Sequence, residues 1–339
     1  MRAIVFERPH QWRLAERPTP HPAPGEVLLR VEAAGLCGTD LHIYHGRFPA
    51  QFPLIPGHEY AGIVEQVGHD VTSIRPGELV AVEPNLPDLT CPQCKRGRTN
   101  LCQSLRAFGV QMDGGFATHC LVPADHLFVV PPGLDAEEAA LLEPIGCCLH
   151  GLEQVRIAHG DRVVIIGAGW IGLIMTQLVR LRGAGAVIVS EPKQAKRAHA
   201  ARLGADQVVD PLTQDLQGIV RERTDGAGAD LVIEVVGSAR TAAQALELVS
   251  AGGQVLIFGV APPEATVEVE PYRIYRQEIT VTGSFSLQYN HQAAARLIAA
   301  RRLDVKSLVT GRFALGDFAQ ALQEQEDSAA IKSVLLPWR

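Results

Sequence analysis

The sequence predicts an α/β protein that joins a doubly wound parallel sheet to a β-rich domain. Between residues 146 and 286, short apolar runs alternate with helical stretches such as KQAKRAHAARLG, a pattern typical of a parallel sheet with helices on both faces. The first 145 residues are instead rich in proline and glycine and carry short β-like segments. A chain of 339 residues with 47% hydrophobic composition is long enough to bury two cores.

The β-rich domain is expected to form irregular sheets, because turn residues interrupt its apolar runs. The runs read EVLLRVEAAG from Glu26, AGIVEQVG from Ala61, ELVAVEP from Glu78 and HLFVVPP from His126. We therefore expect a β-rich domain over residues 1–145.

Six buried strands are expected over residues 146–286. They read VVII, AVIVSE, QVVD, DLVIEVVG, QVLIFGV and ITVTGSF in chain order. After Ser286, a helix over 291–300 and the segment up to Trp338 no longer follow this six-strand pattern. We expect residues 287–339 to return to the first domain.

The most informative motif is RVVIIGAGWIGLIMTQLVRL, which begins at Arg162. An apolar strand leads into a turn with Gly167, Gly169 and Gly172, and helix-spaced apolar residues follow. Such a turn holds a dinucleotide pyrophosphate on backbone N–H groups and the helix dipole. Glu191 follows Gly172 by 19 residues at the end of a second apolar run, where a carboxylate can accept hydrogen bonds from the adenosine ribose. The sequence therefore predicts a dinucleotide site.

A membrane span is the alternative for this stretch, because Val163 to Val179 is uncharged and nearly long enough to cross a bilayer. Three glycines interrupt it, and it contains Thr176 and Gln177. We therefore interpret it as a strand and helix of a soluble domain.

The composition limits which partners and which cellular compartment are expected. A net charge of -6 without basic clusters gives no footprint for nucleic acid or an anionic membrane, so we expect a small-molecule partner. No apolar signal segment precedes the strand-like AIVFE near Met1, which favours a cytoplasmic location. The seven cysteines are an odd number and three of them cluster, which favours metal binding over disulfides in such a chain.

Candidate metal ligands occur in three motifs of the first domain: CGTDLH from Cys37, GHEYAG around His58, and EP at Glu143. A cysteine, a histidine and a carboxylate supply the sulfur, nitrogen and oxygen that zinc accepts tetrahedrally. Taken singly, each has an ordinary explanation as a buried thiol, a hydrogen-bonded histidine or a helix-start carboxylate. Together with the dinucleotide turn they indicate a catalytic zinc, which keeps one position for water or substrate.

These motifs make the whole chain similar to the zinc-dependent medium-chain alcohol and polyol dehydrogenases, in the branch of the sorbitol, xylitol and threonine dehydrogenases. The resemblance implies a GroES-like catalytic domain, a Rossmann coenzyme domain and reversible hydride transfer between a secondary alcohol and a nicotinamide. It also implies that Cys37, His58 and Glu59 hold the catalytic zinc, with Glu143 either a further ligand or the holder of the zinc-bound water.

The same resemblance implies a proton relay. It runs from the Thr39 hydroxyl beside the zinc, through the nicotinamide ribose, to His42 near solvent. Capping of the following helix by Thr39 and Asp40 is the structural alternative, and the two roles are compatible.

A second metal site is implied by the stretch DLTCPQCKRGRTNLC. The family's structural zinc lobe places four cysteines where this chain has positions 88, 91, 94 and 102, and position 88 is an aspartate here. Because a carboxylate oxygen can complete a tetrahedral site, we expect a structural zinc bound by Asp88, Cys91, Cys94 and Cys102. An empty lobe is the alternative.

The cofactor is expected to be NAD, because the Glu191 charge lies where the 2′-phosphate of NADP would sit. Lys193 and Arg197 would soften this preference, but we interpret them as solvated charges on a helix face. The residues expected to contact the cofactor lie in the glycine turn and at the ends of the strands: Gly167, Gly169, Trp170, Ile171, Gly172, Glu191, Val236, Gly237, Gly259, Val260, Ser284 and Phe285.

The substrate stays open between related branches. CGTDLHIY is similar to the threonine dehydrogenases, whereas Glu143 before Pro144 is typical of the polyol enzymes. A polyol is therefore the first expectation, and L-threonine or another secondary alcohol or diol the second. The resemblance also implies a homodimer or homotetramer. A nicotinamide-binding protein without turnover is the alternative from another class, and it would not need the proposed zinc ligands and relay together.

Overall fold

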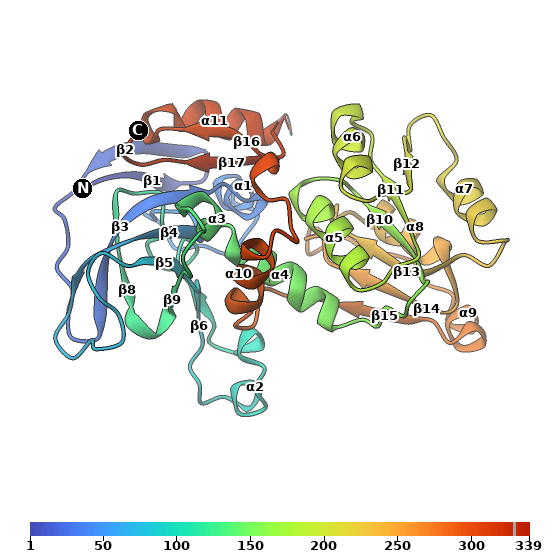
Figure 1. Cartoon of the computed structure of the whole chain (residues 1–339), viewed down its shortest axis with the longest axis horizontal. Helices are drawn as coiled ribbons and strands as arrows, with labels where there is room; N and C mark the ends of the chain where they lie inside the picture. The colour runs from blue at the N-terminus through green and yellow to red at the C-terminus, as the bar shows by residue number, and fades with distance from the viewer. Residues whose placement is uncertain (328–329) are drawn as a thin grey trace. The chain divides into compact units, whose positions relative to one another are not determined.

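The structure is a computed structural model that describes residues 1–327 and 330–339. It divides into two compact units, the first formed by Met1–Gly146 with Leu287–Arg339 and the second by Cys147–Ser286 (Figure 1). The first unit thus ends at residue 146, one residue after the expected boundary at 145, and the C-terminal segment lies in the first unit.

The first unit is built around a seven-stranded sheet with the order β16-β17-β3-β4-β5-β9, in which β8 also pairs with β3. Its strands are β3 (Glu26–Gly35), β4 (Glu59–Val67), β5 (Leu79–Val82), β8 (His119–Pro123), β9 (Leu127–Val129), β16 (Val309–Phe313) and β17 (Lys332–Leu335). Two small sheets pair β1 (Arg2–Arg8) with β2 (Gln11–Glu16) and β6 (Asn85–Leu86) with β7 (Arg106–Ala107).

Short helices connect these strands. They are α1 (Gly38–Tyr44), α2 (Pro92–Lys95), α3 (Ala136–Ala140), α10 (His291–Ala299) and α11 (Phe318–Glu326). Helix α4 (Leu142–Glu153) begins in the first unit and ends in the second. Four 3-10 turns are η1 (Thr99–Leu101), η2 (Ala124–His126), η3 (Lys306–Leu308) and η4 (Leu315–Asp317). In Figure 1 the segment that carries β6 and α2 extends away from the remaining strands of its unit.

Strand β3 lies in the middle of the sheet, and most of its residues are buried. It pairs antiparallel with β4, β8 and β17. At its carboxyl end, Gly35 lies opposite Glu59 of β4 on one side and Val334 of β17 on the other. Cys37 then caps the start of α1. This end of β3 therefore gathers chemically active residues from three strands and one helix.

Aromatic packing fixes the C-terminal segment in the first unit. The ring of Phe318 on α11 lies 5.9 Å from that of Phe6 and 5.8 Å from that of Phe116, between centroids. Arg2 Nη2 donates a hydrogen bond to the carbonyl of Pro337 at 3.0 Å, and Figure 1 shows the two chain ends close together. Buried aromatic rings contribute large apolar areas, so they account for the return of this segment.

The second unit is a six-stranded parallel sheet with the order β12-β11-β10-β13-β14-β15. Its strands are β10 (Arg162–Ile166), β11 (Ala186–Ser190), β12 (Gln207–Val209), β13 (Ala229–Glu234), β14 (Val249–Ile257) and β15 (Thr280–Gly283). Its helices are α5 (Trp170–Leu181), α6 (Gln194–Arg202), α7 (Leu216–Arg223), α8 (Ala239–Leu248) and α9 (Pro271–Gln277). The expected doubly wound α/β fold beside a β-rich domain is confirmed.

The strand order of this sheet reverses between β10 and β13, which are neighbours. Both have apolar, fully buried residues such as Val164 and Val232 at their centres, as expected for strands covered on both faces. Doubly wound sheets bind their ligands at the carboxyl ends of the two strands where the order reverses.

The uncharged stretch from Val163 to Val179 forms β10, the glycine turn and most of α5. Within the described ranges, the chain has no helix with the length and apolar character needed to span a bilayer.

The pair Arg162–Asp230 joins β10 to β13 and yields a test of stability. Arg162 Nε and Nη2 donate to the two carboxylate oxygens at 2.9 and 3.1 Å, and these bonds hold the pKa of Asp230 below its ordinary value. We expect Asp230→Asn to lower the free energy of unfolding by about 1 kcal/mol at pH 7. Because the folded-state pKa is lowered, the contribution is present above about pH 4 and is lost as the pH falls through the folded-state pKa.

Urea unfolding at pH 7 and at pH 3 measures this difference. Asp225→Asn serves as the matched control, because Asp225 is exposed and near the same arginine without a hydrogen bond to it. A loss for Asp230→Asn that is no larger than the control's, or that persists unchanged in acid, would contradict the assignment.

Candidate functional site

Three candidate metal ligands converge at the carboxyl end of β3. Cys37 caps α1, His58 directly precedes β4, and Glu59 is the first residue of β4. One sulfur, one nitrogen and one oxygen from these side chains lie within 4.8 Å of one another, and both His58 and Glu59 are buried. The structure thus brings together three of the expected ligands.

Asp40 ties these residues to one another. Its Oδ2 accepts a hydrogen bond from the Cys37 backbone N–H at 2.8 Å, and its Oδ1 accepts one from Gly57 at 3.3 Å. Oδ1 also lies 3.7 Å from Nδ1 of His58. Asp40, fully buried, therefore closes the first turn of α1 and links it to the segment that carries His58.

The buried charges fit a divalent cation. Asp40 and Glu59 are buried carboxylates, and Cys37 binds metals as a thiolate, whereas Lys332 of β17 is the buried cation beside them. Two positive charges would balance this set, since uncompensated buried charge is costly. Nδ1 of His58 is buried without a hydrogen-bond partner. A sulfur, nitrogen and oxygen donor set suits zinc with one position left open.

Glu143 lies outside this group of three. It is the second residue of α4 and is buried. Its charge acts on Glu83, whose pKa is raised to about 8, mainly by burial. Glu83 in turn accepts hydrogen bonds from the backbone and side chain of Asn85 at 3.2 and 2.9 Å. The charge of Glu143 thus acts on a second buried carboxylate.

The two expected relay residues lie on α1. The hydroxyl of Thr39 is 3.8 Å from the sulfur of Cys37, and His42 follows one turn later on the same helix face. Burial lowers the pKa of His42, and the nearby Arg47 and His45 lower it further. Its imidazole is therefore neutral near pH 7 and can accept a proton. Of the two expected capping residues, Asp40 closes this helix start and Thr39 does not.

The lobe around α2 forms a second compact donor group. One oxygen of Asp88 and the sulfurs of Cys91, Cys94 and Cys102 lie within 4.8 Å of one another. Backbone N–H groups of Cys91 and Thr90 bond to Asp88 and hold the pKa of its carboxyl well below its usual range. The N–H of Asp88 points to the Cys102 sulfur at 3.2 Å. This set of three sulfurs and one oxygen fits a tetrahedral zinc.

The glycine turn after β10 has the geometry that a dinucleotide phosphate needs. Gly167 has a φ of +105°, which side chains rarely adopt. A Cβ on Gly172 would lie 2.0 Å from the carbonyl oxygen of Gly167, so only glycine allows this close turn. Around Gly169, which caps α5, the space for a Cβ is open, so a ligand can approach the backbone there.

Glu191 braces this turn from the end of β11. Its Oε2 accepts a hydrogen bond from the N–H of Ala168 at 2.9 Å, and its Oε1 accepts one from Lys193 at 2.9 Å. Arg197 is not a solvated charge, which corrects the sequence interpretation. It donates to the carbonyls of Glu191 and Pro192 and pairs with Asp210 at 3.1 Å.

The remaining expected cofactor residues follow the carboxyl ends of β13, β14 and β15 or begin α5. Trp170 and Ile171 are the first two residues of α5. The other six comprise exposed apolar side chains, a serine and two glycines: Val236, Gly237, Gly259, Val260, Ser284 and Phe285. A Cβ on Gly259 would lie 2.2 Å from the Gly237 nitrogen, so two of these turns touch. All follow strand ends on the edge that carries the glycine turn.

Sequence reasoning missed two buried charged residues at these sites. Glu234 ends β13, and its Oε1 accepts hydrogen bonds at 2.8 Å from the N–H groups of Val236 and Gly237 and from Thr241, so it shapes that turn. Lys332 forms an ion pair with Glu59. The available signal in each case was a charged residue inside an apolar run, DLVIEVVG and IKSVLL.

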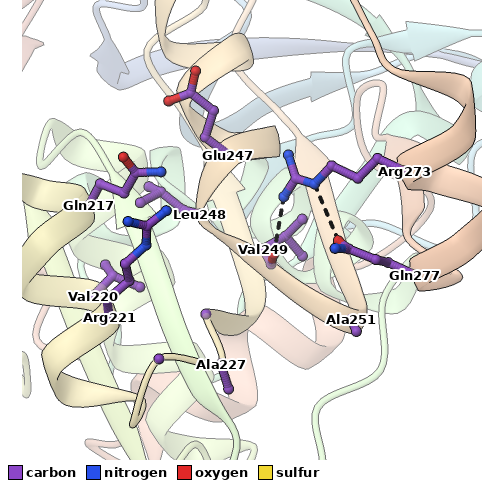
Figure 2. A pocket seen from close by; sticks show the side chains of 12 residues that line it. Gln217, Val220, Arg221, Ala227, Glu247, Leu248, Val249, Ala251, Arg273 and Gln277 are labelled. Carbon is purple, nitrogen blue, oxygen red and sulfur yellow. Dashed lines mark hydrogen bonds between the residues drawn. The ribbon is translucent and has the colours of Figure 1, made fainter.

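A cavity of about 370 Å³ lies elsewhere in the second unit, at the amino ends of β13 and β14. Figure 2 shows Arg221 and Glu247 at its wall, with Arg273 held by Gln277 at 3.2 Å and by the carbonyl of Val249 at 3.5 Å. It occupies the sheet edge opposite the glycine turn, and its lining includes none of the expected site residues. We therefore keep it separate from the candidate site.

Comparison with known proteins agrees with this site. Residues 23–132 match the family model of the alcohol dehydrogenase GroES-like domain, and residues 171–300 match that of the zinc-binding dehydrogenases. The GroES-like domain implied by the motifs is thereby confirmed.

Whole-length relatives extend the match. D-altritol 5-dehydrogenase from Agrobacterium fabrum is 35% identical, with 98% of each chain covered. L-threonine 3-dehydrogenase from Thermococcus kodakarensis is 35% identical over 99% of this chain and 98% of its own. A solved structure from Sinorhizobium meliloti 1021, described as a zinc-binding dehydrogenase bound to NADP, is 38% identical with a TM-score of 0.94 over 99% of both chains.

These matches span both units and every motif from which the site was built. The chain therefore belongs to the zinc-dependent medium-chain alcohol and polyol dehydrogenases, oxidoreductases that transfer hydride between a CH–OH carbon and a nicotinamide cofactor.

Proposed function

We propose that the chain oxidises one secondary alcohol group of a polyol to a ketone, with NAD as the hydride acceptor. The observation that carries this proposal is the group formed by Cys37, His58 and Glu59, with the Thr39 hydroxyl beside it. A donor set with three protein ligands is typical of catalytic zinc, whereas a structural site uses four.

The residues divide the chemistry between them. Zinc, when bound, supplies a Lewis acid that lowers the pKa of an alcohol, and the nicotinamide supplies the hydride acceptor. Cys37, His58 and Glu59 would hold the metal, the last two from buried side chains. Thr39 Oγ1 takes the alcohol proton and passes it towards the His42 imidazole, which holds it near solvent. We propose no ligand role for Glu143, because the three-residue group forms without it.

A polyol is favoured over L-threonine as the substrate. Glu143 before Pro144 follows the polyol pattern, and the relative from Agrobacterium fabrum acts on an alditol. The relative from Thermococcus kodakarensis keeps L-threonine as the second candidate. Initial rates across four- to six-carbon polyols, simple secondary alcohols and L-threonine separate the two, and a dominant threonine rate would overturn the polyol assignment.

NAD is favoured over NADP because of the charges around β11. Glu191 keeps its carboxylate at the end of this strand, bonded to two backbone N–H groups. Apart from the lysines of α6 and its cap, Arg197 is the cation nearest in sequence to Glu191 that could bind a 2′-phosphate. Its guanidinium is already hydrogen-bonded to two carbonyls and paired with Asp210. Because the solved structure from Sinorhizobium meliloti is bound to NADP, kinetics with both cofactors test this preference.

We also propose a homo-oligomer in the cytoplasm. Strand β15 lies at the edge of the six-stranded sheet, and Val281 on it is exposed, which suits pairing with a second copy. A reducing compartment suits the seven cysteines, all of which are free thiols in the structure.

The catalytic zinc assignment predicts a loss of turnover on removal of a ligand. We expect Cys37→Ser and His58→Ala to lower the rate of NAD reduction by about 10³-fold or more, because several kcal/mol of charge stabilisation disappears. NAD binding, measured by calorimetry, is expected to change little. Cys147→Ser, a half-buried cysteine outside both metal groups, is the control. Retained turnover in either ligand variant would disprove the zinc assignment.

The relay assignment predicts a pH-dependent defect. We expect His42→Ala to slow alcohol oxidation by up to about 10²-fold at low pH. The deficit should narrow as the pH rises, because hydroxide and buffer bases then take the proton. Rates measured from pH 6 to pH 10 test this, with His69→Ala as an exposed histidine control. A constant ratio of variant to wild type across the range would remove His42 from the relay.

The cofactor assignment predicts a change in preference when the charge of Glu191 is removed. We expect Glu191→Gln to raise kcat/KM for NADP relative to NAD by about 10-fold, since about 1.4 kcal/mol of repulsion is relieved. Glutamine keeps an acceptor oxygen for the N–H of Ala168 but loses the acceptor for the N–H of Lys193, so the rate with NAD is compared with the wild type to detect any change in the turn. Steady-state kinetics with both cofactors measure the ratio. An unchanged ratio would show that another feature selects the cofactor.

A further inference from the structure

Lys332 is a buried lysine whose ammonium forms an ion pair with Glu59. Its side chain is only 4% exposed and that of Glu59 only 1%. Lysine is almost never buried unless paired, because removing an ammonium from water is costly. Its strand otherwise contributes buried serine, valine and leucine to the sheet. A charge at this position is therefore expected to have a specific purpose.

The strand order explains how the two side chains meet. Lys332 lies on β17 and Glu59 on β4, and β3 runs between these strands. Gly35 of β3 is the residue opposite Glu59. A Cβ on Gly35 would lie 2.2 Å from Glu59 Oε2 and 3.1 Å from Lys332 Cε. The missing side chain on the middle strand thus opens the space in which the ion pair forms.

Gly35 is required for this space and not for its backbone conformation. Its φ lies outside the left-handed region that favours glycine, and it sits in a regular strand. Three residues from three strands therefore form one unit, in which the glycine leaves room for the ion pair between the lysine and the carboxylate.

We propose that Lys332 is a positioning residue of the catalytic metal centre. Its ammonium holds the Glu59 carboxylate over Gly35 and beside Cys37 and His58, so that Glu59 is oriented to bind the metal. This inference rests on the proposed catalytic zinc at these residues.

The charges of the centre support this role. With a divalent metal bound, the partly buried Cys37 thiolate and the buried carboxylates of Asp40 and Glu59 exceed the metal by one negative charge, and Lys332 supplies the missing positive charge. Groups that orient metal ligands from behind commonly change metal affinity by about 10- to 100-fold when removed. If direct repulsion were the only effect of Lys332 on the metal, its removal would strengthen metal binding. If Lys332 positions Glu59, its removal weakens metal binding, so the sign of the change in affinity separates the two roles.

The test compares Lys332→Met with Lys332→Arg, which keeps the charge. We expect zinc at the Cys37 centre to bind about 10- to 100-fold more weakly in the methionine variant, and the arginine variant to recover part of this loss. Affinity is measured by competition with a chelator on the full chain, and the zinc of the Asp88 lobe serves as an internal reference. Lys306→Met, which removes an exposed lysine paired with Asp135, should leave zinc affinity unchanged.

Cobalt substitution adds a readout that a purely structural role would not move. The thiolate-to-cobalt and d–d absorption of the Cys37 centre should shift in Lys332→Met and recover in Lys332→Arg. In a Glu59→Gln background, removal of Lys332 should add little further loss, because Lys332 acts through Glu59. Equal or tighter zinc binding in Lys332→Met, with an unchanged cobalt spectrum, would overturn the proposal.

Two further variants keep the outcomes distinct. If Lys332→Met does not fold, Gly35→Ala tests the same unit, since its Cβ would displace the ion pair; wild-type zinc affinity in that variant would overturn the proposal. If Cys37→Ser loses zinc while Lys332→Met retains it fully, the role of Lys332 is refuted and the metal centre stands. Retention of both zinc ions in Cys37→Ser would refute the metal centre itself.

Discussion

The compensation of buried charge at the carboxyl end of β3 is the constraint on which the first unit depends. Asp40, Glu59 and Lys332 are all removed from water, together with the partly buried Cys37. Such groups are tolerated only when paired or bound to metal. Asp40 satisfies this requirement with two backbone N–H groups, Glu59 does so with Lys332, and the remaining negative charge calls for a divalent cation. The sheet register therefore brings the candidate metal ligands and the residues that compensate their charge to the same place.

The second unit meets its own constraint with backbone groups. Its parallel strands are buried on both faces, so polar groups gather at the strand ends. Glu191 bonds to the N–H of Ala168 in the glycine turn, and Glu234 bonds to Val236 and Gly237 in the turn after β13. These two buried carboxylates hold the turns on either side of the point where the strand order reverses. The shape of the turns follows from this bracing as much as from the glycines.

Local motifs were predictable from the sequence, and long-range register was not. The glycine turn and the Cys37 and His58 motifs are short, and their spacing constrains their geometry, so they could be read directly. The Gly35–Glu59–Lys332 unit depends on β17 pairing with β3, which spacing does not encode. The sequence likewise could not place Glu143, because the EP motif does not set the direction in which α4 presents its carboxylate.

Anomalous diffraction at the zinc absorption edge, on crystals of the full chain, tests the central claim most directly. Our account predicts one strong peak bounded by Cys37, His58 and Glu59, with Lys332 still paired to Glu59, and a second peak within the Asp88 lobe. A zinc-loaded protein with no peak at Cys37, or with a peak there from which Glu59 has turned away towards another partner, would contradict it.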